Sequence, residues 1–195
     1  MLMLFLGITA FVLFFIYDIN NFLWHHSLPR TFFTVGVLLL SLSMLYELYS
    51  AHSSLAGFQD VLLLCLSFIF LLALIYTLFF ALPFKETYTQ HDKGRFVCDK
   101  GIYALCRHPG ILCFFGMSIF SGFSALPSPE LLIHGMIYSV LNLIYAYFQD
   151  CITFPRTFTD YREYQQRVPF LLPTRESIKC FCKTLYHSSS KEVNS

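Results

Sequence analysis

Arg107, His108 and Pro109 stand side by side in the stretch GIYALCRHPG, directly before a run of apolar residues. An arginine and a histidine are costly at membrane depth, and a proline removes a backbone donor and breaks a helix. The three residues therefore mark either the boundary of a helix or a functional site.

A second set of polar residues recurs within a later apolar stretch. Its members are four, four, three and four positions apart, so they share one face of a helix: His134, Tyr138, Asn142, Tyr145 and Gln149. Polar side chains within an apolar span face protein or a cavity more often than lipid. We interpret the first four as the lining of a substrate cavity whose lower end points at Asp150. Hydrogen bonding between helices is the alternative.

The composition of the chain indicates an integral membrane protein. Of its 195 residues, 56% are hydrophobic and 13% are charged, whereas soluble domains have roughly 25% charged residues. Membrane lipids are therefore expected partners. A net charge of +1 gives no reason to expect a nucleic-acid partner, and the oligomeric state stays open.

Five apolar stretches position the polar residues, and we predict that each is a helix. They cover residues 1–17, 31–48, 61–84, 111–126 and 131–148, and a helix needs about 20 residues to cross a bilayer. The first lacks the basic region and the cleavage site of a secretory signal, so we expect it to be retained. The short connection 127–130 predicts that the last two helices form a hairpin. The expected fold is an all-α polytopic membrane protein with about five transmembrane helices and a cytoplasmic carboxyl-terminal segment.

The basic residues predict the orientation of these helices. If all five cross, the loops at 50–58 and 127–130 lie on the side of the amino terminus, and neither contains a Lys or an Arg. All 13 basic residues then lie on the other side, which the positive-inside rule makes cytoplasmic. We expect the amino terminus outside, in a bacterial plasma membrane or in the endoplasmic reticulum.

The seven cysteines indicate neither disulfides nor a metal site. Five of them fall on the predicted cytoplasmic side, where thiols stay reduced. Cys180 and Cys182 offer two metal ligands, but no second pair follows at the spacing of a zinc finger.

Two stretches carry a resemblance to a known family. GIYALCRHPG is similar to the G-x-Y-x-x-x-R-H-P-x-Y signature of the membrane methyltransferases that include isoprenylcysteine carboxyl methyltransferases and phospholipid N-methyltransferases. DYREYQQRVPFLLP resembles their second signature, Y-x-x-Y-x-x-x-V-P, which a Glu-Glu pair precedes. Counting back from Tyr161 by the family's spacing reaches Gln149 and Asp150. The likeness divides the chain into amino-terminal transmembrane helices (1–84), a methyltransferase-like core that contains the hairpin (85–173) and a cytoplasmic tail (174–195).

The resemblance implies a methyltransferase that uses S-adenosylmethionine at the cytoplasmic membrane surface. The acceptor would be a lipophilic molecule from the bilayer, such as an isoprenylcysteine carboxylate or a phospholipid amine. A guanidinium fork suits the cofactor's carboxylate, and a carboxylate suits its amino group or ribose. The likeness assigns catalysis to Arg107 and Asp150, and cofactor binding to these two together with Tyr103, His108, Pro109, Gly110 and Gln149.

Interfacial roles are the alternatives for several of these residues. Arg107 would then anchor a helix at the lipid head groups, and His108 would fill the interface. For Tyr161, in the second signature, a place in the aromatic belt is the favoured interpretation.

Four residues depart from the family pattern. Ile111 and Cys113 stand where Tyr and Gly are usual. Gln149 and the shorter acid Asp150 replace the Glu-Glu pair, and the change at Gln149 removes a carboxylate. These departures weaken the expectation of activity more than the expectation of fold. Two other functions therefore stay open: a sterol-reductase-like enzyme that uses NADPH, and a non-catalytic membrane binding or assembly subunit.

Overall fold

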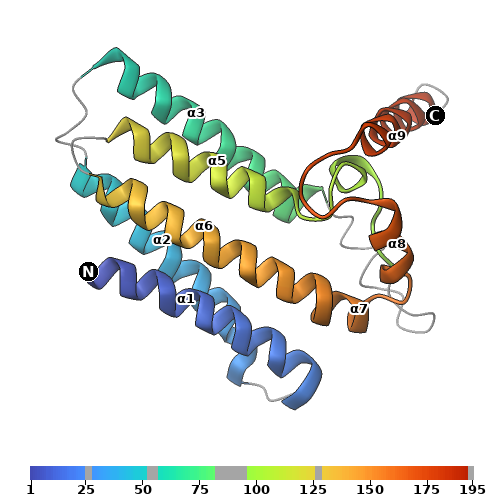
Figure 1. Ribbon diagram of the computed structural model, residues 1–195, viewed down its shortest axis with the longest axis horizontal. Coiled ribbons are helices and arrows are strands. Elements are labelled where there is room, and N and C mark those ends of the chain that lie inside the picture. Colours follow the sequence, from blue (N-terminus) through green and yellow to red (C-terminus); the bar gives the residue numbers. More distant parts are fainter. Residues whose placement is uncertain (25–27, 52–56, 82–95, 126–128, 193–195) are drawn as a thin grey trace. The chain divides into compact units, whose positions relative to one another are not determined.

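The computed structural model describes residues 1–24, 28–51, 57–81, 96–125 and 129–192, and every regular element in these ranges is a helix. Five α-helices are apolar: α1 (Leu2–Ile19), α2 (Phe32–Ala51), α3 (Phe58–Ile75), α5 (Pro109–Ser124) and α6 (Glu130–Phe148). Three further α-helices follow: α7 (Phe154–Thr157), α8 (Tyr161–Arg167) and α9 (Arg175–Glu192). Short π- and 3-10 helices connect them: η1 (Asn20–Trp24), η2 (Leu28–Thr31), η4 (Tyr76–Phe80), η5 (Gly101–Ala104) and η6 (Gln149–Thr153). Figure 1 shows these elements along the chain.

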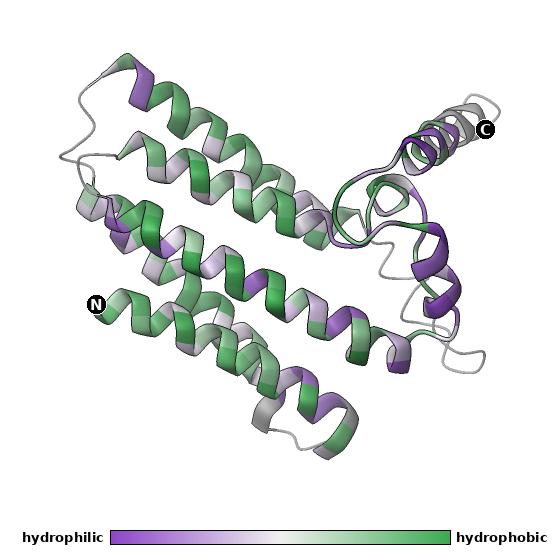
Figure 2. Cartoon of the chain, viewed as in Figure 1, coloured by the Kyte–Doolittle hydropathy of each residue, from purple (hydrophilic) through white to green (hydrophobic). Residues whose placement is uncertain are grey.

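Four helical segments are long and apolar enough to cross a membrane. They are Leu2–Ile19, Phe32–Ala51, Phe58–Phe80 and Glu130–Thr157, and hydrophobic residues dominate them (Figure 2). The predicted all-helical class is confirmed, and the pattern is that of a multi-pass membrane protein. The fifth predicted span is the shorter helix α5, which has 16 residues. The connection of the predicted hairpin at 126–128 lies outside the described residues.

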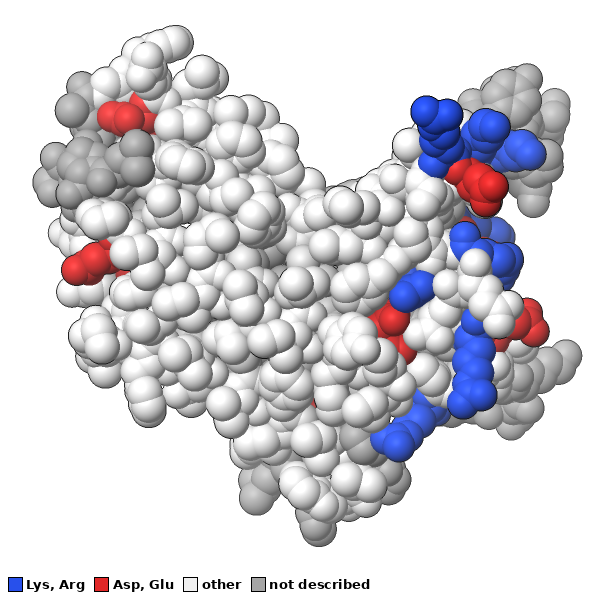
Figure 3. Space-filling view, in the orientation of Figure 1, with Lys and Arg blue, Asp and Glu red and all other residues white. Residues whose placement is uncertain are grey.

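The chain forms two compact units. Unit 1 contains Met1–Leu72 and Cys113–Thr153, and unit 2 contains Ala73–Leu112 and Phe154–Ser195. The Lys and Arg residues whose side chains are described belong to unit 2, apart from Arg30, and Figure 3 shows several of them over α7 to α9.

In unit 1, α1 and α6 run in the same direction and α2 runs opposite to both. Near the start of α1, the Met3 carbonyl accepts a hydrogen bond from Tyr138 Oη over 3.0 Å. Near the end of α1, Asp18 accepts one from Gln149 of η6, directly after α6. On α2 the order is reversed, because Ser43 contacts Tyr138 whereas the later Glu47 contacts His134.

Small residues allow the other helices of unit 1 to pack closely. Between α3 and α5, Ser67 Oγ donates to the Met117 carbonyl over 2.9 Å, and Gly116 lies against the ring of Phe70. Between α5 and α6, Gly122 approaches the backbone of Leu132. Glycine at such positions lets helix backbones come together in a membrane.

Unit 2 is built around aromatic residues of the short helices. Tyr161, Tyr164 and Val168 form its buried cluster, against which Val97, Phe154 and Phe158 pack. Asp160, directly before α8, accepts a hydrogen bond from the Val97 amide over 2.9 Å. This bond ties α8 to the segment that leads into residues 101–110.

Candidate functional site

Residues 101–110 form a short irregular segment that ends where α5 begins. Gly101 has φ +58°, a left-handed conformation that glycine adopts without strain, and it opens η5. Pro109 is the first residue of α5, a position where its missing N–H costs nothing. Of the two interpretations of this cluster, the helix boundary is therefore present at Pro109, two residues before the predicted start, and the functional site stays a prediction.

Arg107 joins this segment to the second signature within unit 2. Its backbone amide donates to the Pro169 carbonyl over 2.9 Å. Its Nη1 donates to the carbonyls of Gln165 (2.9 Å) and Val168 (2.7 Å). The last carbonyls of a helix have no partner within the helix, so a cation here stabilises the end of α8. The guanidinium also lies 5.7 Å from the ring centroid of Phe170.

His108 is buried among aromatic rings of unit 2. Its backbone amide donates to the Phe170 carbonyl over 3.2 Å. Its imidazole stacks on Phe154, with centroids 5.8 Å apart, and lies 4.9 Å from the Phe170 ring. The residue is therefore part of the protein interior of unit 2 and not a filler at the lipid interface.

The tyrosines of the two signatures connect the same segment to η4 and α8. Tyr103 Oη donates to the Thr77 carbonyl over 2.8 Å, and Tyr164 Oη donates to the Tyr103 carbonyl over 2.7 Å. Burial raises the pKa of Tyr164 far above its usual value, so this phenol remains a neutral donor. The aromatic-belt interpretation of Tyr161 is wrong, because its side chain is 3% exposed and packs within the cluster of unit 2.

Gly110 is the last of the predicted cofactor-binding residues that belong to unit 2. A Cβ atom there would lie 3.5 Å from Leu74 and 3.6 Å from Thr77, which is ordinary contact. The space around Gly110 therefore does not itself require a glycine.

Gln149 and Asp150 belong to unit 1, in the π-helix that continues α6. Gln149 Nε2 donates to Asp18 Oδ2 over 2.9 Å and to Tyr145 Oη over 3.0 Å. Asp150 is buried and does not lie at a solvated helix end. The predicted meeting of Asp150 with Arg107 joins residues of different units and stays a prediction.

The polar stripe of α6 takes part in hydrogen bonds between helices. His134 Nδ1 lies 2.6 Å from Glu47 Oε1, and Tyr138 Oη lies 2.8 Å from Ser43 Oγ. Tyr145 is buried against Phe14 and Phe15 of α1, whereas Asn142 is only partly buried. Interhelical bonding is therefore present for this stripe, and its contact with a substrate stays a prediction.

Three further polar residues of unit 1 that were not predicted from the sequence bond to the residues of the stripe: Asp18, Ser43 and Glu47. Asp18 and Glu47 are 4% and 7% exposed, and both lie on helices that are apolar enough to cross a membrane. Their signal was available, since an ionisable residue within a transmembrane segment is a candidate functional residue by default. What the sequence did not give was their partner on α6.

No protein-family model, curated protein or solved structure matches this chain.

Proposed function

We propose that the chain is an integral membrane methyltransferase that uses S-adenosylmethionine to methylate a lipophilic acceptor. The observation that supports this most directly is the pairing of the two signature segments in unit 2. Four hydrogen bonds join Arg107 and His108 to residues 165–170, although the segments are about 60 positions apart in the chain. A pair of short motifs that matches by chance has no reason to pair in the fold.

The side chains of Arg107 and Asp150 suit different polar groups of this cofactor. Arg107 offers a planar fork for a carboxylate, and the acid Asp150 is suited to an amino group or a ribose. Bound S-adenosylmethionine supplies an electrophilic methyl group on a sulfonium. The residues of the chain would hold and align the reactants and keep water away, since a displacement depends on positioning.

In this proposal the basic side chains face the cytoplasm and the amino terminus lies outside. The parallel course of α1 and α6 supports an odd number of membrane-spanning helices between them in the sequence. The helices α2, α3 and α5 would be these three. The short helix α5 would then cross as well, at the cost of some local thinning of the bilayer.

A non-catalytic binding or assembly subunit is the second candidate. The hydrogen bonds of His134, Tyr138 and Gln149 to α1 and α2 favour it, because these side chains already serve in packing. A chain that keeps the fold without the reaction would preserve such bonds.

Calorimetric titration of the purified protein in lipid nanodiscs, with S-adenosylmethionine and separately with NADPH, tests the proposal. We expect binding of the first only, and weaker binding in Asp150→Asn, which removes a negative charge with little change in volume. Binding of NADPH alone would support the reductase, and binding of neither would support the assembly subunit. Glu163→Gln, an exposed acid on α8, is the matched control and should bind like the unmodified protein.

A further inference from the structure

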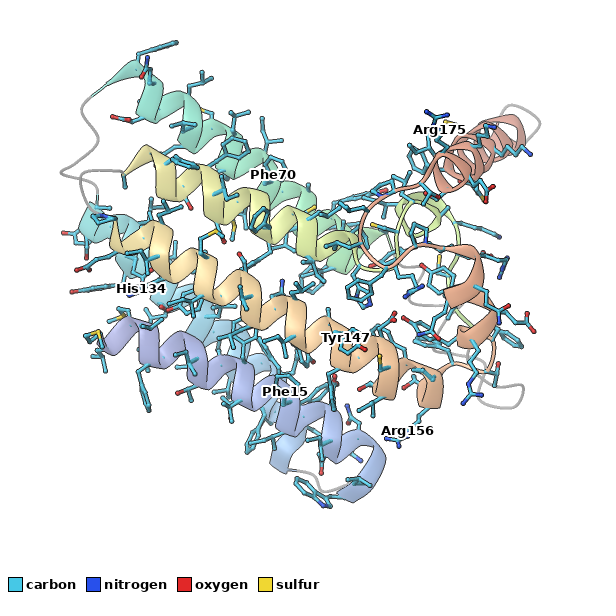
Figure 4. The ribbon with its side chains drawn as sticks, in the orientation of Figure 1. Phe15, Phe70, His134, Tyr147, Arg156 and Arg175 are labelled. Atoms are coloured by element: carbon cyan, nitrogen blue, oxygen red, sulfur yellow. The ribbon has the colours of Figure 1, made fainter. Side chains whose placement is uncertain are left out.

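Glu47 and His134 form a buried ionisable pair within the apolar helices of unit 1. The carboxylate Oε1 and the imidazole Nδ1 are 2.6 Å apart, and the residues are 7% and 8% exposed. Glu47 lies in the last turns of α2 and His134 in the second turn of α6, where Figure 4 labels it. The pair is therefore close to the end of both helices that lies away from Gln149.

Charge compensation for Glu47 is scarce in this part of the molecule. The helices α1, α2, α3, α5 and α6 contain no Lys or Arg, and His134 is their single histidine. Among the described residues, the other charged groups that act on Glu47 are Glu130 and the amino group of Met1, which have opposite signs. Tyr138 of α6 also faces it, and the ionisable side chain of α5 is Cys113, near the opposite end of that helix.

A carboxylate beside a neutral imidazole would therefore leave a net negative charge in an apolar surrounding. Burying such a charge is costly, and proteins avoid it by pairing the group or by taking up a proton. One additional proton makes the Glu47–His134 pair electrically neutral.

The second carboxylate oxygen of Glu47 can be protonated by this proton. Oε2 is buried and has no hydrogen-bond partner among the described residues. Because one hydrogen already bridges Oε1 and Nδ1, the neutralising proton resides on Oε2 or on the other imidazole nitrogen. An unpaired buried carboxylate oxygen is otherwise costly to keep.

We propose that Glu47 and His134 form a proton-binding site within the membrane-spanning helices. The site exchanges its proton with the aqueous phase at the end where α2 ends and α6 begins. His134 is four residues from the start of α6, or about 6 Å along the axis at 1.5 Å per residue.

The next turn of the helices closes the site on the other side. Tyr138 is fully buried there and bonds to Ser43 and to the Met3 carbonyl. Because these groups are neutral and already hydrogen-bonded to one another, the proton leaves the site toward one membrane face. The inference does not depend on methyl transfer.

Nitrogen-15 NMR of the histidine-labelled protein in detergent micelles tests this inference. The His134 signal is assigned by its loss in His134→Gln and followed from about pH 5 to about pH 9, where histidine titrates in proteins. In the unmodified protein we expect the signal to change in a single step that corresponds to one proton. In Glu47→Gln the proton concentration at the midpoint of this step should differ by a factor of about ten or more, because the variant lacks the charge partner at hydrogen-bonding distance. Glu130→Gln, one turn away, should move the midpoint much less.

An unchanged midpoint in Glu47→Gln would overturn the inference. If that variant does not fold, the unmodified protein with carbon-13 glutamate provides the second measurement. The Glu47 carboxyl signal should then change over the same pH range as the His134 signal. Independent titration of the two groups would contradict a shared site.

Discussion

Arg107 Nη1 donates a hydrogen bond to the main-chain oxygen of Val168 over 2.7 Å, across 61 residues of sequence. The same atom reaches the Gln165 carbonyl, so one nitrogen serves two carbonyls at the end of α8. The arginine that the sequence suggested for the cofactor's carboxylate therefore also holds the second signature in place. Substitution of Arg107 should therefore affect the stability of unit 2.

We expect Arg107→Lys to lower the free energy of unfolding by roughly 1.5–3 kcal/mol, the range for hydrogen bonds to charged groups. A lysine ammonium keeps the charge but lacks the planar fork that meets both carbonyls. Denaturant titration in detergent micelles measures the loss, and Arg162→Lys, an exposed position on α8, is the control. Weaker binding of S-adenosylmethionine in a folded Arg107→Lys protein would add a ligand role, whereas equal stability would contradict the capping role.

Gln149 and Asp18 allow a charge-exchange experiment. Gln149→Glu places a second carboxylate against Asp18 Oδ2, where the amide now donates a hydrogen bond over 2.9 Å. We expect a loss of about 1–3 kcal/mol in unfolding free energy, because a buried acceptor loses its donor. The double variant Asp18→Asn/Gln149→Glu restores one amide and one carboxylate and should recover most of that loss. Absence of recovery would mean that the two side chains are not coupled.

Gly7 is predicted to tolerate no larger residue. A Cβ atom at this position would overlap the ring of Tyr138 and its hydroxyl. Gly7→Ala should therefore destabilise the protein by about 1–3 kcal/mol, as overpacking of a filled core does. Gly110→Ala is the matched control, since its Cβ would meet neighbours at 3.5 Å or more. Thermal unfolding in micelles compares the two, and an equal effect would contradict the close packing of α1 on α6.

Labelling of cysteines tests the orientation of the helices. We expect Ser54→Cys and Ser128→Cys, both at positions outside the described residues, to react with an impermeant thiol reagent added to intact cells. Cys98 and Cys182 should react only after the membrane is opened. Reaction of Ser128→Cys from the cytoplasmic side alone would overturn the predicted hairpin between α5 and α6.

The sequence predicted the helices well because apolar length and composition are local properties. The stretch 131–148 corresponds to α6 within one residue, and Pro109 begins α5 as a helix-breaking residue should. The π-helices at Tyr76–Phe80 and Gln149–Thr153 were not foreseen, since a π-turn has no clear local signal. The predicted span 61–84 begins earlier, at Phe58.

The contacts of the candidate site were harder to predict because they depend on which helices become neighbours. Helical periodicity placed His134, Tyr138 and Gln149 on one face of α6, and that face is the one that bonds to other helices. It did not reveal that Glu47 and Asp18 are the acids opposite that face. Sequence spacing defines a face, but only tertiary packing selects its partner.

Two buried acids of unit 1, Asp18 and Glu47, lie far before their hydrogen-bond partners in the sequence. Asp18 is 131 residues before Gln149, and Glu47 is 87 residues before His134. During synthesis, α1 and α2 are therefore inserted into the bilayer before α6 has been translated. Asp18 is the second-to-last residue of α1, so its insertion costs less than the roughly 2.5–3.5 kcal/mol of an aspartate at a helix centre, and the surrounding leucines and phenylalanines outweigh it. The arrival of α6 then removes this cost, so insertion and assembly are separate stages of biogenesis. A ribosome stalled before residue 130 would leave Asp18 and Glu47 in the membrane without the partners to which they bond in the complete protein.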